Sequence, residues 1–199
     1  LVGSEMCIRD SYKAKDDKDA LDKIKNIVSK IGDFDTAGYN REKAAKPAKD
    51  SQEIYGILPR SRSEQYDMQA IIDRLVDYSD FEEYKKGYGQ TILTGYARID
   101  GWAVGIIANQ RTLVKTKSGE MQFGGVIYSD SADKATRFIA NCNQKKIPLV
   151  FLQDVTGFMV GSKSEHGGII KDGAKMVNAV SNSVAVSYTH LTLPTMLMV

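Results

Sequence analysis

The chain has few of the residues that mark metal-binding, disulfide-rich and membrane proteins. Its 199 residues include two cysteines, Cys7 and Cys142, and two histidines, His166 and His190. Two cysteines cannot build a disulfide framework, and this small Cys/His set does not favour a metal site, so we expect no metal. The longest apolar run in the middle of the chain, residues 147–152, is far shorter than the ~20 residues of a membrane span. We therefore expect a cytosolic type of chain.

An excess of charge of one sign is also missing. Lys and Arg number 27 against 25 Asp and Glu, a net charge of +2. This balance excludes a protein that binds polyanions by bulk charge, although a local basic patch stays open. Hydrophobic residues make up 42% and charged residues 26%, which is typical of a globular chain. The length suits one domain of ordinary size.

The two ends differ from the middle. Residues 186–199 contain no Lys, Arg, Asp or Glu, and residues 1–11 show no periodicity that links them to the helical pattern after them. Both strings resemble translated sequencing-adapter read-through; an ordinary tail at each end is the alternative. We interpret residues 1–11 as a non-native leader and residues 185–199 as a non-native tail, and exclude both from fold prediction. The native chain would then be longer in both directions.

Apolar spacing predicts the elements of the first half of the middle. A helical period covers residues 17–31 and stops at Gly32, and a polar segment, residues 33–53, is typical of a linker between domains. Asp67 can cap a helix that carries one apolar stripe over residues 68–76. Residues 91–99 and 102–108 predict two strands, which a type I′ turn at Asp100 and Gly101 would join.

The second half predicts alternating strands and helices. Residues 129–131 offer caps for a helix that places Ala135, Phe138, Ile139 and Cys142 on one face. Residues 148–152 lack polar alternation and predict a strand buried on both faces of a parallel sheet. A further helix uses Ile169, Ile170, Ala174, Val177 and Val180. This order predicts parallel βαβ units with any site at the carboxyl ends of the strands.

The loop after the buried strand is the most informative segment. It holds Gly157, Gly161, Gly167 and Gly168, which permit backbone angles and close approaches that side chains would block. The last two stand at the mouth of a helix, where exposed amides could face a developing anion. Turns alone would also explain single glycines. The cluster at the end of a buried strand favours a functional loop.

Asp154 and Glu165 could form a general acid/base pair, but they could equally cap the loop and begin a helix. His166 could titrate near neutrality, or simply face solvent. Cys142 lies on an apolar helix face and is expected to pack in the core. The chain lacks G-x-S-x-G and G-x-x-x-x-G-K-[ST], which argues against serine hydrolysis and phosphoryl transfer.

Several motifs together carry a family resemblance over roughly residues 12–184. They are Ile54-Tyr-Gly-Ile-Leu-Pro59, Tyr66-Asp-Met68, Gly95-Tyr-Ala-Arg98, Gly105-Ile-Ile-Ala-Asn109 and residues 147–177. The chain resembles the carboxyltransferase (beta) subunit of biotin-dependent acyl-CoA carboxylases, in its 3-methylcrotonyl-CoA carboxylase-like branch. Many members of that family carry Pro after Asp-Val, where this chain has Thr156.

The resemblance implies an α/β, crotonase-like (ClpP/crotonase) fold, present in part. Residues 12–50 would be the end of the N-terminal half with its linker, and residues 51–184 the first part of the C-terminal carboxyltransferase domain. The implied function is carboxyl transfer from carboxybiotin to an acyl-CoA of the methylcrotonyl or propionyl kind. Carboxybiotin would be carried on a partner domain. This fragment alone is expected to be inactive.

The resemblance also implies a site and partners. Carboxybiotin would be lined by Asp154, Val155, Thr156, Gly157, Phe158, Met159, Val160, Gly161, Glu165, Gly167, Gly168 and Ile169. No residue of the chain is assigned a catalytic role, because the backbone N–H pairs that hold the family's oxyanions are expected outside it. Implied partners are an acyl-CoA, a biotin carboxylase/biotin carrier (alpha) subunit and further beta subunits, with no nucleic acid and no membrane. The implied location is the bacterial cytoplasm or the mitochondrial matrix.

Three alternatives stay open. A crotonase-fold acyl-CoA hydratase or isomerase would need no biotin. A biotin-dependent decarboxylase would use a similar subunit in a membrane assembly. An inert structural partner would stabilise an assembly without chemistry. Fold-level analogy alone decides none of them.

Overall fold

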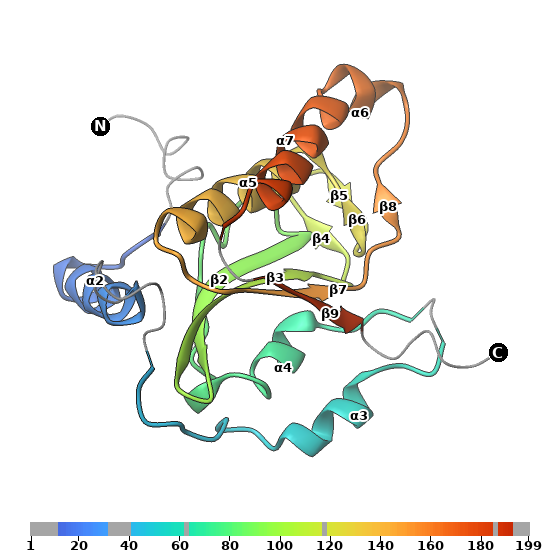
Figure 1. Cartoon of the computed structure of the whole chain (residues 1–199). Coiled ribbons are helices and arrows are strands. Elements are labelled where there is room, and N and C mark those ends of the chain that lie inside the picture. The colour runs from blue at the N-terminus through green and yellow to red at the C-terminus, as the bar shows by residue number, and fades with distance from the viewer. Residues whose placement is uncertain (1–11, 32–40, 62–63, 117–118, 185–186, 193–199) are drawn as a thin grey trace.

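The computed structural model describes residues 12–31, 41–61, 64–116 and 119–184, and the backbone of residues 187–192. A five-stranded sheet in the order β1-β2-β3-β7-β9 lies at its centre (Figure 1). Helices α5 (Ser129–Gln144) and α7 (Ile169–Ser181) cover one face, and the short helix α4 (Met68–Ile72) lies on the other. The predicted α/β class is therefore confirmed as three layers. The suspected leader, residues 1–11, lies outside the described residues.

The antiparallel half of the sheet is a hairpin. Strands β2 (Ile92–Ile99) and β3 (Trp102–Asn109) pair along their full length, from Ile92 opposite Asn109 to Ile99 opposite Trp102. Asp100 and Gly101 both have positive φ, 51° and 80°, which is the type I′ geometry that the sequence predicts. Asp77 holds this turn, since its carboxylate accepts from the amides of Asp100 and Gly101 at 2.9 and 2.6 Å.

The other half of the sheet is parallel. Strand β7 (Leu149–Gln153) pairs in parallel with β3 after the chain has crossed over through α5. Strand β9 (Ser187–Thr192) pairs in parallel with β7 after α7. These two units confirm the predicted βαβ order. The backbone of β9 belongs to the tail that we excluded from fold prediction, and the non-native origin of that tail stays a prediction.

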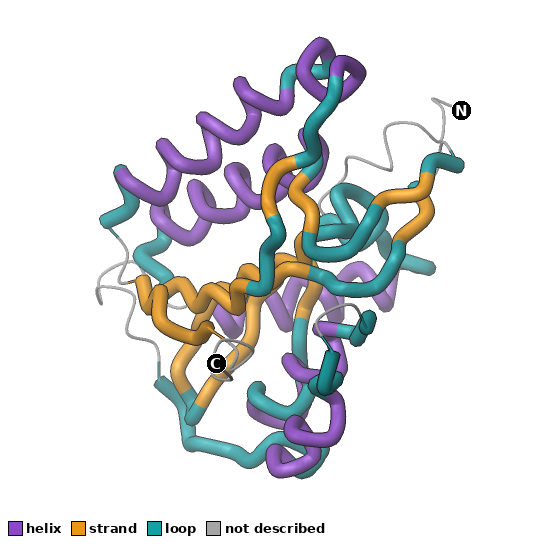
Figure 2. Tube along the Cα trace, turned by 90° about the vertical axis from the view of Figure 1, so that its right-hand side faces the viewer, coloured by secondary structure: helices purple, strands orange, loops and turns teal. Residues whose placement is uncertain are grey.

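Two apolar clusters fill the spaces above and below the sheet, because side chains alternate along β2 and β3. Ile92 and Tyr96 pack under α5, where Phe138 and Cys142 are fully buried. Leu93 and Ala97 face the opposite way, toward α4 and its flanking turns. Figure 2 shows helices α5 and α7 next to each other on one side of the strands. The core prediction for Cys142 is confirmed.

Short elements complete the described fold. They are η1 (Ser51–Glu53), α3 (Ile54–Ile57), η2 (Asp77–Ser79), β1 (Glu82–Glu83), β4 (Val114–Lys115), β5 (Met121–Gln122), β6 (Val126–Ile127), β8 (Gly157–Phe158) and α6 (Ser162–His166). The helix expected over residues 68–76 is shorter, since after Ile72 the amides of Arg74 and Leu75 turn to carbonyls three residues back. Asp67 caps it as predicted, accepting from Gln69 N.

Helix α2 (Asp17–Ile31) has the predicted bounds, but its apolar stripe is not in the core. Leu21, Ile24 and Val28 are each more than half exposed, whereas Lys30 is buried and bonds Asp80 at 2.7 Å. No described element covers that stripe. Among the described helices, none combines the length and the apolar content needed to cross a membrane.

Lys134 is the largest fully buried side chain of the described chain. Its Nζ donates to the carbonyl of Ile92 at 2.9 Å and lies 3.5 Å from Glu83 Oε1. Burial lowers the pKa of Lys134 from its usual 10.5 to about 8, and Glu83 opposes this shift. A buried ammonium with one carboxylate beside it therefore sits under the centre of α5.

Stability is expected to rise with pH because of Lys134. Between the folded pKa of about 8 and the unfolded value of 10.5, the unfolded state binds more protons, so deprotonation favours the fold. Between pH 7 and 8.5 the free energy of unfolding should rise by about 1 kcal/mol. Urea titrations at both values, repeated with Lys134→Met, check this. A variant with the same pH slope as the parent contradicts it.

Candidate functional site

The candidate site begins where β7 ends, at the carboxyl edge of the parallel strands. Asp154 follows the strand directly, and the segment behind it runs over the edge of β6. The sequence predicts an uninterrupted loop over residues 155–168, and this prediction is wrong. The segment contains strand β8 and helix α6, because the glycines at its turns let it fold back on neighbouring backbone.

Backbone hydrogen bonds fasten the first part of this segment. Strand β8 pairs in parallel with β6, with Val126 opposite Gly157. Thr156 N donates to Gly125 O at 2.7 Å, and Met159 N donates to Ile127 O at 2.9 Å. Gly161 then turns the chain into α6 with φ 116° and ψ 155°, a region open in practice to glycine alone. Residues 154–161, which we call the wall, are therefore held against neighbouring backbone by hydrogen bonds.

Asp154 is held by Tyr66, which begins one of the family motifs, and by Arg111, and the sequence assigned neither of them to the site. Tyr66 Oη donates to Asp154 Oδ2 at 2.6 Å, and Arg111 Nε lies 3.3 Å from the same oxygen. Burial, and then the bond to Asp154, raise the pKa of Tyr66 well above its usual value. A carboxylate with two such partners can anchor the chain at this point, and its assignment as carboxybiotin lining stays a prediction.

Arg111 follows the end of β3 as Asp154 follows the end of β7, and β3 and β7 are parallel neighbours. That shared edge is the signal that could have found Arg111 from the sequence, once both strands had been predicted. Tyr66 carries no such signal. It reaches the edge from the turn before α4, on the other side of the sheet.

Glu165 and His166 lie apart from Asp154. Both are exposed on α6, and no hydrogen bond or ion pair of the described chain joins either of them to Asp154. His166 Nδ1 is 2.7 Å from the carbonyl of Ser162, a bond within its own helix. The acid/base pair that the spacing left open is therefore not assembled here, and the solvent-facing interpretation of His166 is confirmed.

The expectation that Gly167 and Gly168 offer free amides was wrong. Gly167 N donates to Lys163 O at 3.0 Å, and Gly168 N donates to Glu165 O at 3.1 Å. Both amides complete the last turn of α6, a helix that the sequence did not predict. Gly168 still serves α7, because its φ of 93° lets the chain turn from one helix into the next.

An apolar rim borders the segment on the side of α7. Ile170 and Val177 are 74% and 60% exposed, and Phe158 and Val160 are exposed beside them. Together with Ile169 and Gly173 they line a hollow of about 360 Å³. Gly173 permits this packing, since a Cβ there would lie 2.9 Å from the Phe158 ring. Of the predicted stripe of α7, Ile169 faces the core while Ile170 and Val177 face outward.

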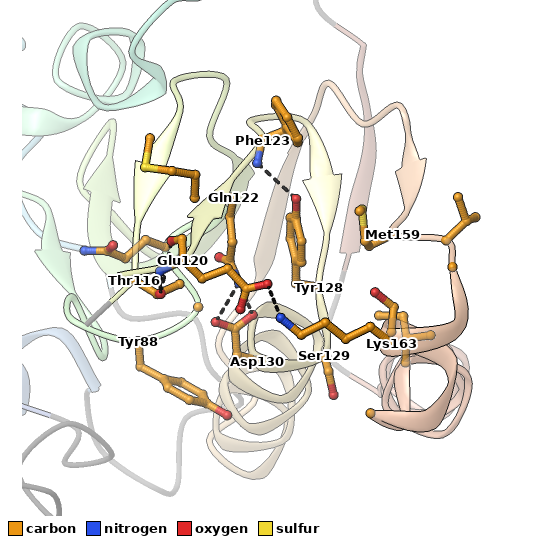
Figure 3. A pocket seen from close by; sticks show the side chains of 18 of the residues that line it. Tyr88, Thr116, Glu120, Gln122, Phe123, Tyr128, Ser129, Asp130, Met159 and Lys163 are labelled. Atoms are coloured by element: carbon orange, nitrogen blue, oxygen red, sulfur yellow. Dashed lines mark hydrogen bonds and ion pairs between the residues drawn. The ribbon is translucent and has the colours of Figure 1, made fainter. Parts of the chain in front are cut away.

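A second hollow of about 610 Å³ lies on the other side of α6 (Figure 3). Met159, Val160, Gly161, Gly167 and Ile169 of the predicted lining border it, and so do Tyr88, Gln122 and Tyr128 from other elements. An ion pair of 2.8 Å between Lys163 and Glu120 reaches across it. Val155 instead lines a hollow of about 340 Å³ against Phe151 and Met176. The predicted lining thus borders several hollows.

Among the described residues, no three His, Cys, Asp or Glu side chains lie close enough together to hold a metal ion.

Comparison with known proteins gives one family. The protein-family model described as the carboxyl transferase domain matches residues 10–193. The methylcrotonoyl-CoA carboxylase beta chain, mitochondrial, of Arabidopsis thaliana is 42% identical over 187 residues, which cover 91% of this chain and 30% of that protein. The biotin-dependent 3-methylcrotonyl-coenzyme A carboxylase beta1 subunit of Mycobacterium tuberculosis is 40% identical, with 85% and 30% covered. The chain spans about 30% of the length of these relatives.

Solved structures agree with this match. A transcarboxylase 12S crystal structure, described as a hexamer assembly with methylmalonyl-coenzyme A bound, has a TM-score of 0.80 at 32% identity and covers 93% of this chain and 35% of its own. The beta subunit of the geranyl-CoA carboxylase of P. aeruginosa has a TM-score of 0.64 at 32% identity, with 88% and 31% covered.

Proposed function

This chain belongs to the carboxyl transferase domain family, and from this premise we propose that it forms the carboxybiotin side of an acyl-CoA carboxyltransferase. Its fold is the crotonase-like fold of the family's beta subunits, present in part. The observation that carries the proposal is the wall of residues 154–161 at the carboxyl edge of the parallel strands, fastened by backbone bonds. Sites of α/β sheets form at this edge.

The exposed apolar residues of this wall could contact the fused rings of biotin. Val155, Phe158 and Val160 are exposed along it, Val155 beside one hollow and the other two beside another, and a Cβ at Gly157 or Gly161 would meet no atom within 4 Å. These residues, with Thr156 and Met159, would hold carboxybiotin, which supplies the carboxyl group when bound. Glu165, Gly167, Gly168 and Ile169 would complete the lining beside α6.

The role of this chain in the reaction would be to hold and to shield. Asp154 is engaged by Tyr66 and Arg111, and His166 Nδ1 is bound to Ser162 within its own exposed helix, so the described chain does not bring the two side chains together as an acid/base pair. The backbone amides that would assist the reaction electrostatically are expected outside this chain, which leaves the wall the task of binding. A hydratase or isomerase without biotin would need such a placed acid or base.

The partners follow from the relatives. The relative of Mycobacterium tuberculosis is named as a biotin-dependent carboxylase beta1 subunit, and a structural neighbour is described as a hexamer assembly. We therefore propose a separate biotin-carrying alpha subunit, an acyl-CoA of the methylcrotonyl or propionyl kind and further copies of the beta subunit. The compartment would be the bacterial cytoplasm or the mitochondrial matrix; the relatives of Arabidopsis and Dictyostelium are named as mitochondrial.

The test is a carboxylation assay with a beta subunit of the relatives' full length that carries this segment. With a biotinylated alpha subunit, bicarbonate, ATP and methylcrotonyl-CoA, label from bicarbonate is expected to enter an acid-stable acyl-CoA product. The 199-residue chain alone is expected to show none. The same assay without the biotinylated subunit is the control. Hydration or isomerisation of the acyl-CoA without any biotin would overturn the proposal.

A further inference from the structure

Two side chains from distant parts of the sequence meet at the start of the candidate wall. Tyr66 Oη donates to Asp154 Oδ2 at 2.6 Å, and Arg111 both approaches that oxygen and donates from Nη1 to Thr156 Oγ1 at 3.3 Å. We propose that Tyr66 and Arg111 are positioning residues that hold the wall of residues 154–161 in place for carboxybiotin. This inference rests on the proposed function.

The two anchors are fixed relative to each other by Gln110. Its Oε1 accepts from Met68 N at 3.0 Å and from Arg111 N at 2.8 Å, while its Nε2 donates to Asp67 Oδ1 at 2.7 Å. One buried amide therefore ties the turn that carries Tyr66 to the residue next to β3. Because buried polar groups that are fully satisfied specify a single arrangement, this link makes the anchors rigid.

Arg111 is also enclosed by backbone. A Cβ at Gly124 would collide with the carbonyl group of Arg111, and a Cβ at Gly125 would collide with its Nη1. These two glycines therefore leave the space that the arginine takes. The carbonyl of Gly125 in turn accepts from Thr156 N at 2.7 Å. Arginine, glycine pair and wall form one packed unit at the strand edge.

The contacts of Asp154 with Tyr66 and Arg111 are shielded from solvent, so they can contribute to holding the wall in place. The side chains of Arg111 and Asp154 are 16% and 20% exposed, unlike a surface ion pair, and Tyr66 is buried. The contact of Arg111 Nε with Asp154 is an ion pair, and the short bond from Tyr66 is the directional one. A hydrogen bond to a charged group is worth roughly a factor of ten in an opening equilibrium.

The first test removes the Tyr66 hydroxyl and leaves its ring. In Tyr66→Phe, amide hydrogen exchange of residues 155–161 is expected to speed up roughly tenfold, while exchange in β7 stays unchanged. Tyr55→Phe is the matched control, since Tyr55 is 83% exposed on α3. Unchanged exchange in the wall of Tyr66→Phe would overturn the proposal, and the measurement needs neither biotin nor an active enzyme.

The second test asks whether Tyr66 acts through Asp154. In an Asp154→Ala background, Tyr66→Phe is expected to add no further exchange, since the shared partner is already gone. Arg111→Lys is expected to loosen the wall as well, because an ammonium is a point charge that cannot replace the forked contacts of a guanidinium. Additive effects of the Tyr66 and Asp154 changes would overturn the coupling.

The third test links the wall to the reaction in the full-length subunit. Tyr66→Phe is expected to raise KM for the biotinylated partner several-fold and to leave KM for acyl-CoA unchanged. Equal rises in both would indicate general damage and overturn the positioning role. If the parent subunit transfers no carboxyl group, the proposed function fails, while the exchange measurement still decides what Tyr66 holds.

Discussion

Phe138→Ala is expected to lower the free energy of unfolding by about 3 to 5 kcal/mol, the range for deleting a buried phenylalanine. Phe138 is fully buried on the core face of α5, with ring centroids 5.6 Å from Tyr84 and 5.0 Å from Tyr96. It also fills the space above Gly105, where a Cβ would lie 3.2 Å from its ring. The cavity would open between α5 and the β2–β3 hairpin, where few neighbouring side chains can shift to fill it. Urea titration of parent and variant measures the change in the free energy of unfolding.

Phe123→Ala is the matched control, because Phe123 is 59% exposed on the rim of the larger hollow. Its change should stay within about 0.5 kcal/mol, as for surface positions in general. A loss at Phe138 as small as that at Phe123 would mean that α5 is not packed on the hairpin as described.

Gly157→Trp is expected to lower carboxyl transfer by about 100-fold and to leave acyl-CoA binding nearly unchanged. A Cβ at Gly157 meets no atom within 4 Å, so the indole has room to extend outward, although the φ of 158° adds backbone strain to any side chain placed there. It would occupy the exposed side of the wall, where carboxybiotin is proposed to lie, and misplacement of reacting groups by about 1 Å costs a factor of that size. Rates and acyl-CoA binding are compared in the full-length subunit.

The control for that change is Gly56→Trp. Gly56 lies on α3, and a Cβ there also meets nothing within 4 Å. Its carboxyl transfer should match that of the parent. If Gly157→Trp weakened acyl-CoA binding as much as it slowed transfer, Gly157 would be a structural residue and the proposed pocket would move elsewhere.

Local signals predicted the elements, and tertiary packing decided which faces are buried. The 15-residue α2 and the hairpin turn at Asp100 and Gly101 follow from spacing and turn chemistry that act within a few residues. The apolar stripe of α2 and the outer side chains of α7 follow the same period but lie exposed. Periodicity reports that a helix has an apolar face, and it does not report what covers that face.

The sequence predicted the part of the candidate site that is contiguous in the chain, and it missed the contacts between residues that are distant in sequence. The wall at residues 154–161 follows from a buried strand that ends in a glycine-rich segment. The short helix α6 inside that segment was missed because five residues carry too little pattern. For the same reason the sequence did not show that the amides of Gly167 and Gly168 donate to carbonyls of this helix. Tyr66 lies 88 positions from Asp154, a separation that no local pattern spans.

The carboxylate of Asp77 also decides which pairing of β2 with β3 the sheet can adopt. Side chains alternate between the two faces of a strand, so a slip by one residue would move Tyr96 and Ile92 from the α5 side to the α4 side. Any slipped pairing would carry Asp100 and Gly101 out of the turn and break both bonds to Asp77. Asp77, which lies outside the hairpin, thereby raises the free energy of pairings in the wrong register. The strand edge that carries the site is therefore held in one register.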